Sequence, residues 1–181
     1  RFYLCELILA VKYLHSKNII HLDIKAENVL IDDEGHVVLA DFDRAFLLEN
    51  TPNDCDFLGT GELMAPEIFN HVAITEKADV WNLGYLAADL VAGRVSRPTK
   101  YPFQSLRDAV KLGLYKLNPN IRLSPEFKQL VNATLTKDYT ERISIREMME
   151  LEFFQDVNWD DVKEKKLDPP FPPIHFTHEF G

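Results

Sequence analysis

The chain has 181 residues, of which 46% are hydrophobic and 27% are charged, and this is enough to bury one core of ordinary size. The formal net charge of −9 argues against a nucleic-acid-binding protein, which would need a clustered basic face, and mildly favours basic partners. No apolar run approaches the roughly 20 residues that span a bilayer, and the first residues lack a signal-peptide pattern. Because Cys5 and Cys55 show no pair or metal spacing, we expect reduced thiols and a cytoplasmic or possibly nuclear protein.

Apolar side chains recur at helical spacing near the N-terminus and predict a helix over residues 2–16. They are Leu4, Leu7, Ile8, Val11 and Leu14. The sequence opens inside this pattern, so we expect it to be part of a longer protein.

Two short β-branched runs, residues 29–31 and 37–39, predict a β-hairpin after the first helix. The turn between them contains Gly35, which can adopt a positive φ. Residues 41–67 lose all periodicity, and a loop of that length inside a compact domain is usually functional or mobile.

A second helix is predicted over residues 77–92, which are apolar on nearly all sides. A helix that is apolar all round is a buried one, so we expect Leu90 and Val91 to be buried with the rest. Gly93 is expected to end this central helix.

Helix-capping signals mark the last third of the chain. Ser124 followed by Pro125 predicts the start of a helix, as an N-cap and a first helical residue. Residues 144–147 fit a capping box for a short helix ending near Leu151. The proline cluster at residues 168–173 cannot continue a helix and is expected to run extended across a surface.

The stretch H-L-D-I-K-A-E-N, residues 21–28, holds the side chains that phosphoryl transfer to a hydroxyl requires. This reaction needs a carboxylate that orients the hydroxyl and takes its proton, ligands for Mg²⁺, and a cation near the moving charge. Asp23, Asn28 and Lys25 supply these three types, and Asp41 after the predicted hairpin offers a second metal ligand. Taken alone, however, the stretch also fits a solvated turn whose side chains cap backbone groups.

The order of several motifs makes the chain resemble a known family. Residues 21–28 are followed by D-F-D at Asp41, G-T-G-E-L-M-A-P-E over residues 59–67, D-V-W-N-L-G over residues 79–84, and a late Arg142. Together they strongly resemble the C-terminal lobe of a eukaryotic protein kinase, over nearly the whole chain.

The end of the chain carries a narrower resemblance, to the AGC group of Ser/Thr kinases. The sequence F-F-Q-D-V-N-W-D-D-V from Phe153, leading to D-P-P-F-P-P, is similar to the start of their C-terminal tail. The resemblance implies a mainly α fold, with a kinase C-terminal lobe over residues 1–154, short β-hairpins at the active site, and the tail over residues 155–181. It also implies an N-terminal lobe as a partner, because these residues contain no glycine-rich loop, strand lysine or glutamate helix.

The resemblance implies that ATP and Mg²⁺ are the cofactors and assigns roles to individual residues. Asp23 matches the catalytic base, Lys25 the lysine that contacts the transferred phosphate, and Thr60 the residue that hydrogen-bonds both. Asn28 and Asp41 match the Mg²⁺ ligands.

Other matches concern the nucleotide and the peptide. Leu30 matches the floor of the adenine pocket. Glu27 and Asp89 match positions that pair with arginines upstream of the phosphoacceptor in basophilic AGC kinases, and the net charge suits a cationic peptide. The alternative is that both acids are solvated surface groups. The loop that receives the residue after the phosphoacceptor matches Gly61, Glu62 and Leu63.

A third set of matches is structural. Glu67 and Arg142 match a family ion pair that ties the A-P-E segment to the lobe. Asp79 matches the carboxylate that accepts backbone donors from the catalytic loop, while His21 and Phe42 belong to the loop motifs themselves.

Several positions depart from the family pattern. Leu22 stands where regulated kinases carry the arginine that clamps a phosphorylated activation loop, and Asp56 stands at the position of the activating phosphothreonine. Because a phosphate there pairs with arginine, the two changes predict that the usual phosphorylation switch is missing. Asp43 replaces the glycine of D-F-G, where glycine-type backbone geometry costs an L-residue roughly 1–2 kcal/mol. Ala26 and Gly61 replace prolines, which loosens their loops.

A Ser/Thr protein kinase acting on proteins with basic motifs is the interpretation that the sequence favours. The departures instead favour a pseudokinase that acts as a scaffold or regulatory binding module, but the intact set of catalytic residue types opposes this alternative. Small-molecule phosphotransferases also use H-x-D-x-x-x-x-N loops, and the A-P-E segment and AGC-like tail argue against them.

Overall fold

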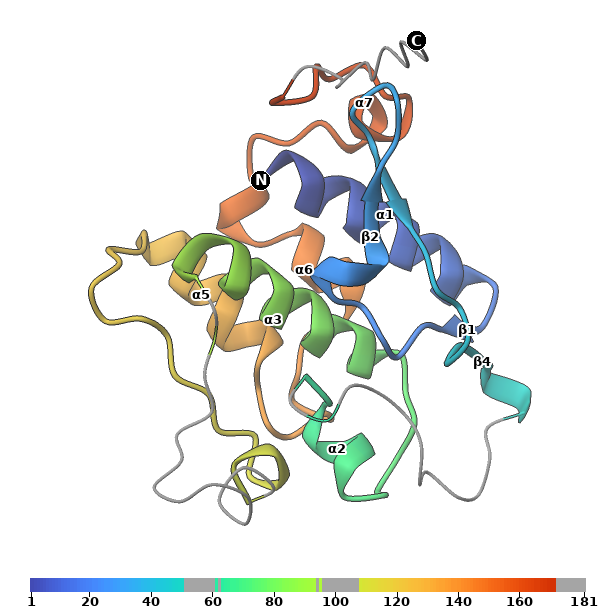
Figure 1. The fold of residues 1–181 in the computed structure, drawn as a ribbon, viewed down its shortest axis with the longest axis vertical. Coiled ribbons are helices and arrows are strands. Elements are labelled where there is room, and N and C mark those ends of the chain that lie inside the picture. Colours follow the sequence, from blue (N-terminus) through green and yellow to red (C-terminus); the bar gives the residue numbers. More distant parts are fainter. Residues whose placement is uncertain (51–60, 62, 94, 96–107, 172–181) are drawn as a thin grey trace, which may run out of the picture.

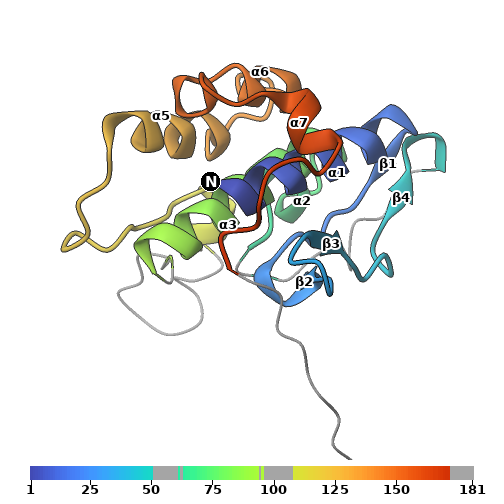
Figure 2. The ribbon, with the colours of Figure 1, turned by 90° about the horizontal axis from the view of Figure 1, so that it is seen from above.

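Helices α1 (Phe2–Ser16) and α3 (Lys77–Ala92) run side by side through the middle of the fold (Figure 1). The computed structural model describes residues 1–50, 61, 63–93, 95 and 108–171. In Figure 2 the later helices lie on one side of this central pair and a small hairpin lies on the other. The predictions made for Cys55, Asp56, Thr60 and Glu62 fall outside the described residues.

Helix α1 buries the face that its periodicity predicts, except that Leu14 is only half-buried. Leu7, Ile8 and Val11 are at most 1% exposed and pack into the core, and His15 is buried in the last turn. Burial raises the pKa of the Cys5 thiol on the same helix to about 11, so it remains protonated at neutral pH. The predicted span, residues 2–16, matches the observed helix.

Helix α3 forms the centre of the core but is not buried along its whole length. Trp81 and Leu83 are fully enclosed, and Gly93 ends the helix with a φ of 71°. Leu90 and Val91 are 62% and 48% exposed, so the prediction that the helix is buried all round is wrong at its last turn. Apolar residue types alone do not reveal where a helix leaves the core.

The close approach of α3 and α5 (Pro125–Thr134) depends on Gly84. A Cβ at this position would lie 2.0 Å from the Thr134 hydroxyl oxygen, which is far inside van der Waals contact. Helix α5 begins as predicted, because the Ser124 side chain accepts a hydrogen bond from the Phe127 N–H.

Three short elements complete the helical part: α6 (Ile145–Met149), η3 (Glu152–Phe154) and α7 (Trp159–Lys163). The predicted capping box is present, since Ser144 and Glu147 exchange hydrogen bonds at the start of α6. Helix α7 was not predicted, and its N-cap is Asn158, whose side chain accepts from two backbone N–H groups. Another short helix, α2 (Pro66–Phe69), lies near the start of α3.

Two small antiparallel sheets lie next to α1. The predicted hairpin pairs β2 (Val29–Ile31) with β3 (Val37–Leu39), in a register that places Leu30 opposite Val38. The second sheet pairs β1 (Ile19–Ile20) with β4 (Phe46–Leu47) and was not predicted, because two-residue strands show no periodicity. The 3₁₀ turns η1 (Ala26–Asn28) and η2 (Leu48–Asn50) adjoin these strands.

The chain after α7 returns to the tip of the β2–β3 hairpin (Figure 1). Lys165 Nζ lies 3.2 Å from Asp32 Oδ2, and Pro169 packs over Gly35. Gly35 has a φ of 88°, as the predicted turn requires, and a Cβ there would also meet Pro169 at 2.9 Å. The described residues after α7 therefore pack against the turn of the β2–β3 hairpin.

Candidate active site

The loop at residues 21–28 is held in place by one buried carboxylate, that of Asp79 at the start of α3. Its oxygens accept from the backbone N–H groups of His21 at 2.9 Å and Leu22 at 2.8 Å, and from His15 Nε2 at 2.8 Å. Leu22 has a φ of 64°, a geometry that costs a side-chain-bearing residue about 1–2 kcal/mol. The charge-assisted hydrogen bonds that the His21 and Leu22 N–H groups donate to Asp79 offset that cost and fix the loop.

His21 joins the loop to the chain after the hairpin. Its Nε2 donates to the Ala40 carbonyl at 3.1 Å, and its Nδ1 accepts from the Asp23 N–H at 3.3 Å. Both nitrogens of the His21 ring are therefore engaged by the backbone of the chain. The Phe42 ring packs edge-on against it, with centroids 4.8 Å apart, so the two motifs form one unit.

Two other predicted site residues contact the Asp23 carboxylate, which is only 4% exposed. Lys25 Nζ lies 2.9 Å from Asp23 Oδ2, and Asn28 Nδ2 lies 3.1 Å from the same oxygen. Asn28 Nδ2 also donates to the Asp23 carbonyl at 2.8 Å. The amide nitrogen of Asn28 is therefore committed to Asp23, and its amide oxygen is the atom that remains for a metal ligand.

Asp41 stands at the end of the hairpin nearest this loop, because the Ala40 N–H donates to the Asn28 carbonyl at 2.8 Å. Its side chain is exposed, and the Asp43 N–H approaches one oxygen at 3.4 Å. Asp41 itself has a φ of 62°, whereas Asp43 does not adopt a positive φ. The backbone cost expected at Asp43 is thus absent, and the left-handed geometry falls two residues earlier.

The site offers a metal one amide oxygen and one carboxylate. In the part of the chain that the structure describes, no three His, Cys, Asp or Glu side chains gather into a metal cage. Mg²⁺ characteristically binds through one or two protein oxygens together with water and substrate phosphates, so Asn28 and Asp41 fit Mg²⁺ in its nucleotide complex. Leu30 and Val38, paired on one face of the hairpin, are 52% and 45% exposed and provide an apolar surface beside them.

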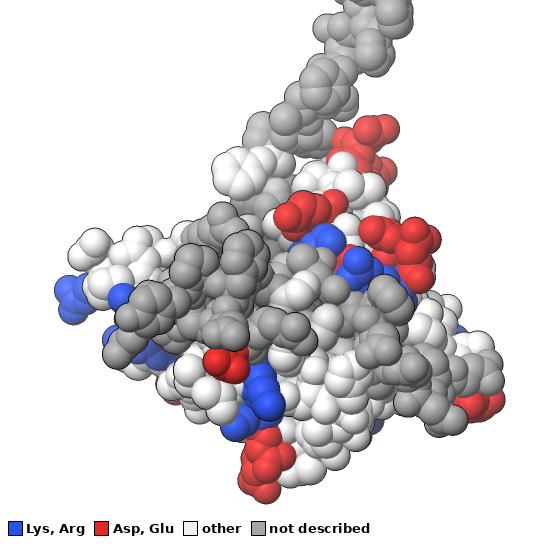
Figure 3. Space-filling model, turned by 60° about the horizontal axis from the view of Figure 1, so that its bottom comes forward, with Lys and Arg blue, Asp and Glu red and all other residues white. Residues whose placement is uncertain are grey.

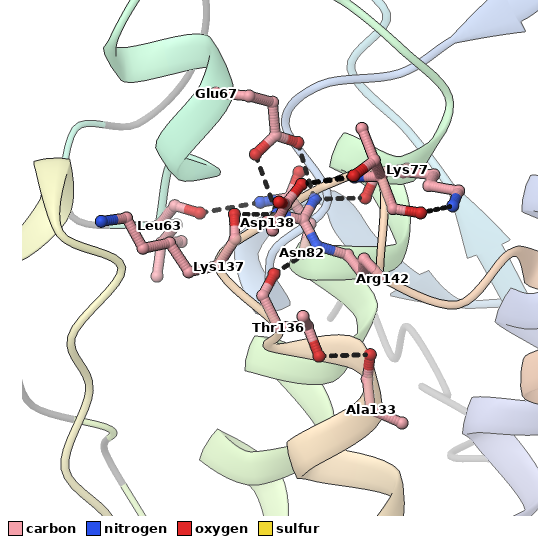
Figure 4. Close-up of polar contacts among 10 residues, drawn as sticks. Leu63, Glu67, Lys77, Asn82, Ala133, Thr136, Lys137, Asp138 and Arg142 are labelled. Carbon is pink, nitrogen blue, oxygen red and sulfur yellow. Dashed lines mark hydrogen bonds and ion pairs between the residues drawn. The ribbon is translucent and has the colours of Figure 1, made fainter.

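Glu67 and Arg142 form a bidentate ion pair inside the fold (Figure 4). The two pairs of atoms are 2.6 and 2.8 Å apart, and the side chains are at most 2% exposed. Arg142 also donates to the carbonyls of Thr136 and Lys77, at 2.9 and 2.8 Å, and its guanidinium stacks over Trp81. The pair connects α2 to α3 and to the loop after α5.

The residues predicted to contact a peptide are less closely grouped. Glu27 is exposed in η1, beside the Asp23 loop, and Gly61 is also exposed. One oxygen of Asp89 accepts from the Val95 N–H at 2.5 Å, so this acid has a local structural contact. Leu63 contributes its carbonyl to Asn82 of α3 at 2.9 Å.

Two polar contacts near the site were not predicted. Glu6 of α1 accepts from His36 Nδ1 at 2.5 Å and from the Val37 N–H at 2.8 Å, and thereby ties the hairpin to α1. Arg44 approaches Asp23, with Nη1 3.9 Å from Oδ1. The available signals in the sequence were Glu6, an acid among the apolar residues in the first half of α1, and an arginine directly after D-F-D.

Surface charge is mixed on the face in Figure 3, where basic groups lie in separate places and some of them have acidic groups beside them. Among the described residues, no helix combines the length and apolar character that a membrane span requires.

Comparison with known proteins identifies the family of the chain. The family model of the protein kinase domain matches residues 1–154. A probable serine/threonine-protein kinase of Dictyostelium discoideum is 37% identical over 180 residues, which cover 96% of this chain and 38% of that protein. Human serine/threonine-protein kinase Sgk1 is 35% identical over 197 residues, covering 99% of this chain and 44% of Sgk1.

Human RAC-beta serine/threonine-protein kinase is 36% identical over 185 residues, covering 96% of this chain and 37% of that kinase. The chain therefore spans less than half the length of these relatives. Because the family model covers most of the chain and the relatives are serine/threonine kinases, the chain belongs to the protein kinase domain family.

Proposed function

We propose that this chain is the C-terminal lobe, residues 1–154, and the first part of the tail, residues 155–181, of an AGC-like Ser/Thr protein kinase. The whole protein transfers the γ-phosphate of ATP to Ser and Thr hydroxyls of other proteins in the cytoplasm or nucleus. The observation that carries this proposal is the arrangement of Lys25 and Asn28 around the buried Asp23 carboxylate, on a loop fixed by Asp79.

Each side chain has a definite task in this reaction. Asp23 orients the acceptor hydroxyl and takes its proton, while Lys25 places a positive charge beside the transferred phosphate. Asn28 and Asp41 hold Mg²⁺, which neutralises phosphate charge when it is bound. Thr60 is proposed to hydrogen-bond Asp23 and Lys25, and Leu30 to lie under the adenine ring.

An N-terminal lobe completes the nucleotide site in this proposal. The exposed Leu30 and Val38 support it, because an apolar pair next to two metal ligands suits the base of a nucleotide. The glycine-rich loop and strand lysine, which would cover the phosphates, belong to that lobe.

Basic peptides are the proposed substrates. Glu27 supports this, because it is exposed next to the Asp23 loop and the chain carries a net charge of −9. Asp89, Gly61, Glu62 and Leu63 complete the proposed peptide surface. A peptide array in which upstream arginine makes no difference to phosphorylation would reject this part of the proposal.

The proposed enzyme has no phosphorylation switch in its activation loop. Leu22 supports this inference, because it is 5% exposed and packs in the core, where it offers no donor to a phosphate. Treatment of the whole protein with a phosphatase is expected to leave its activity unchanged.

The deciding experiment measures transfer of labelled phosphate from ATP to an arginine-rich peptide by the whole protein. The Asp23→Asn variant is expected to lose this transfer, and the matched variant Asp33→Asn, which changes an exposed acid of the hairpin turn, is expected to keep it. Equal background signal from the wild type and Asp23→Asn would reject the enzyme and favour a pseudokinase scaffold.

A further inference from the structure

Arg44 places a second cation beside the proposed catalytic base. Its Nη1 atom lies 3.9 Å from Asp23 Oδ1, whereas Lys25 Nζ lies 2.9 Å from Asp23 Oδ2. The two cations therefore approach different oxygens of one carboxylate. Arg44 reaches this position from the chain between β3 and β4, directly after Asp41, Phe42 and Asp43.

The Nη1 group of Arg44 is a buried donor that makes no hydrogen bond within the described structure, although 38% of the whole side chain is exposed. A buried donor without a hydrogen-bond acceptor is unfavourable, and more so when it is charged. An acceptor brought by a ligand would remove this cost, so the site is suited to a group that accepts from Arg44.

The distance between Arg44 and Asp23 indicates which chemical group of a ligand would fit between them. A distance of 3.9 Å is too long for a direct hydrogen bond, but an oxygen atom placed between Nη1 and Oδ1 can lie at about 2.8 Å from both. Such an oxygen must accept from Arg44 and donate to Asp23. A hydroxyl does both, whereas a carboxylate only accepts and an ammonium only donates.

We propose that Arg44 positions the acceptor hydroxyl, by donating from Nη1 to the hydroxyl oxygen while that hydroxyl donates to Asp23 Oδ1. This inference rests on the proposed kinase function and adds a residue to its acceptor site. One lone pair of the oxygen accepts from Arg44, and the other is directed at the γ-phosphorus of ATP. As the new O–P bond forms, the bond from the γ-phosphorus to ADP breaks and the hydroxyl proton passes to Asp23.

The test measures steady-state peptide phosphorylation by the whole protein and its Arg44→Leu and Arg44→Lys variants. Misplacement of a reacting group costs on the order of 100-fold, so Arg44→Leu is expected to lower kcat for the peptide by roughly that factor. The KM for ATP and the melting temperature are expected to stay unchanged. Arg44→Lys keeps a positive donor and is expected to recover part of kcat.

Arg146, an exposed arginine of α6, provides the matched control, and Arg146→Leu is expected to behave as the wild type. Wild-type kcat in Arg44→Leu would overturn the inference while leaving the proposed function intact. A variant that loses ATP binding and melting temperature together, with no recovery in Arg44→Lys, would overturn it in favour of a structural role. Equal activity of the wild type and Asp23→Asn would instead reject the kinase function, and this inference with it.

Discussion

Asp79 and Asp41 are two carboxylates of the same site that differ in burial and in hydrogen bonding. Asp79 is fully buried and accepts three hydrogen bonds, from His15, His21 and Leu22. Asp41 is exposed, and the nearby Asp43 N–H approaches one of its carboxylate oxygens at 3.4 Å. The carboxylate oxygens of Asp79 are occupied by hydrogen bonds from the chain itself, whereas those of Asp41 face solvent and can bind a cation.

This difference separates the acids of the framework from those of the proposed chemistry. A buried charge is tolerated when its partners replace water, as they do for Asp79 and for Glu67 with Arg142. A metal ligand needs the opposite arrangement, with oxygens that can exchange water for a cation. Substitutions that remove framework acids or their partners should therefore act on stability, and those at open acids should act on transfer.

The largest effect on stability is expected from Arg142→Leu. It leaves Glu67 buried without its partner, which costs about 3–5 kcal/mol, measured as the free energy of unfolding in urea. The matched control is Arg146→Leu, at an exposed arginine of α6, and it is expected to cost less than about 0.5 kcal/mol. Similar losses from both variants would contradict the framework role of the pair.

A smaller loss is expected from Asp79→Asn. Hydrogen bonds to charged groups are worth about 1.5–3 kcal/mol, and an amide cannot accept from all three donors. We expect unfolding to become easier by about 2–3 kcal/mol and amide protection at His21 and Leu22 to fall in hydrogen exchange. Unchanged protection at these two amides would show that Asp79 does not hold the loop.

The smallest effect is expected from Ser144→Ala, which removes half of the capping box of α6 and costs about 1 kcal/mol. Hydrogen bonds from the Ser144 N–H and hydroxyl to Glu147 lower the pKa of that carboxyl below its ordinary value of 4.5. A lowered folded-state pKa adds stability above the unfolded value, and this stability is lost as the pH falls through the folded value. The cost of Ser144→Ala in urea unfolding should therefore be larger at pH 6 than at pH 3, and an equal cost at both would contradict the role of the ionised Glu147.

The parts of the fold that could be predicted are those with long or chemically marked local patterns. Helices α1 and α3 carry several turns of periodicity, α5 and α6 carry caps, and the hairpin carries two β-branched runs around a glycine. The β1–β4 pair and α7 are too short to show a period. The exposed end of α3 could not be predicted, because exposure depends on what other elements cover.

The candidate site shows the same division. The types and order of Asp23, Lys25, Asn28 and Asp41 were visible in the sequence because they belong to compact motifs. The contact of Arg44 with Asp23 was not predicted, since it joins segments 21 residues apart that meet only after the hairpin folds. The pairing of Glu6 with His36 has the same origin.

The most direct test of the account is a Mg²⁺ titration of labelled-phosphate transfer by the whole protein and its Asp41→Asn variant, with thermal unfolding measured on the same samples. We predict that Asp41→Asn loses most transfer at every Mg²⁺ concentration that saturates the wild type, while its melting temperature stays within about 1 °C of the wild type. Undiminished transfer in Asp41→Asn, or a loss that follows from unfolding, would contradict the assignment of the open acids to chemistry and the saturated acids to the framework.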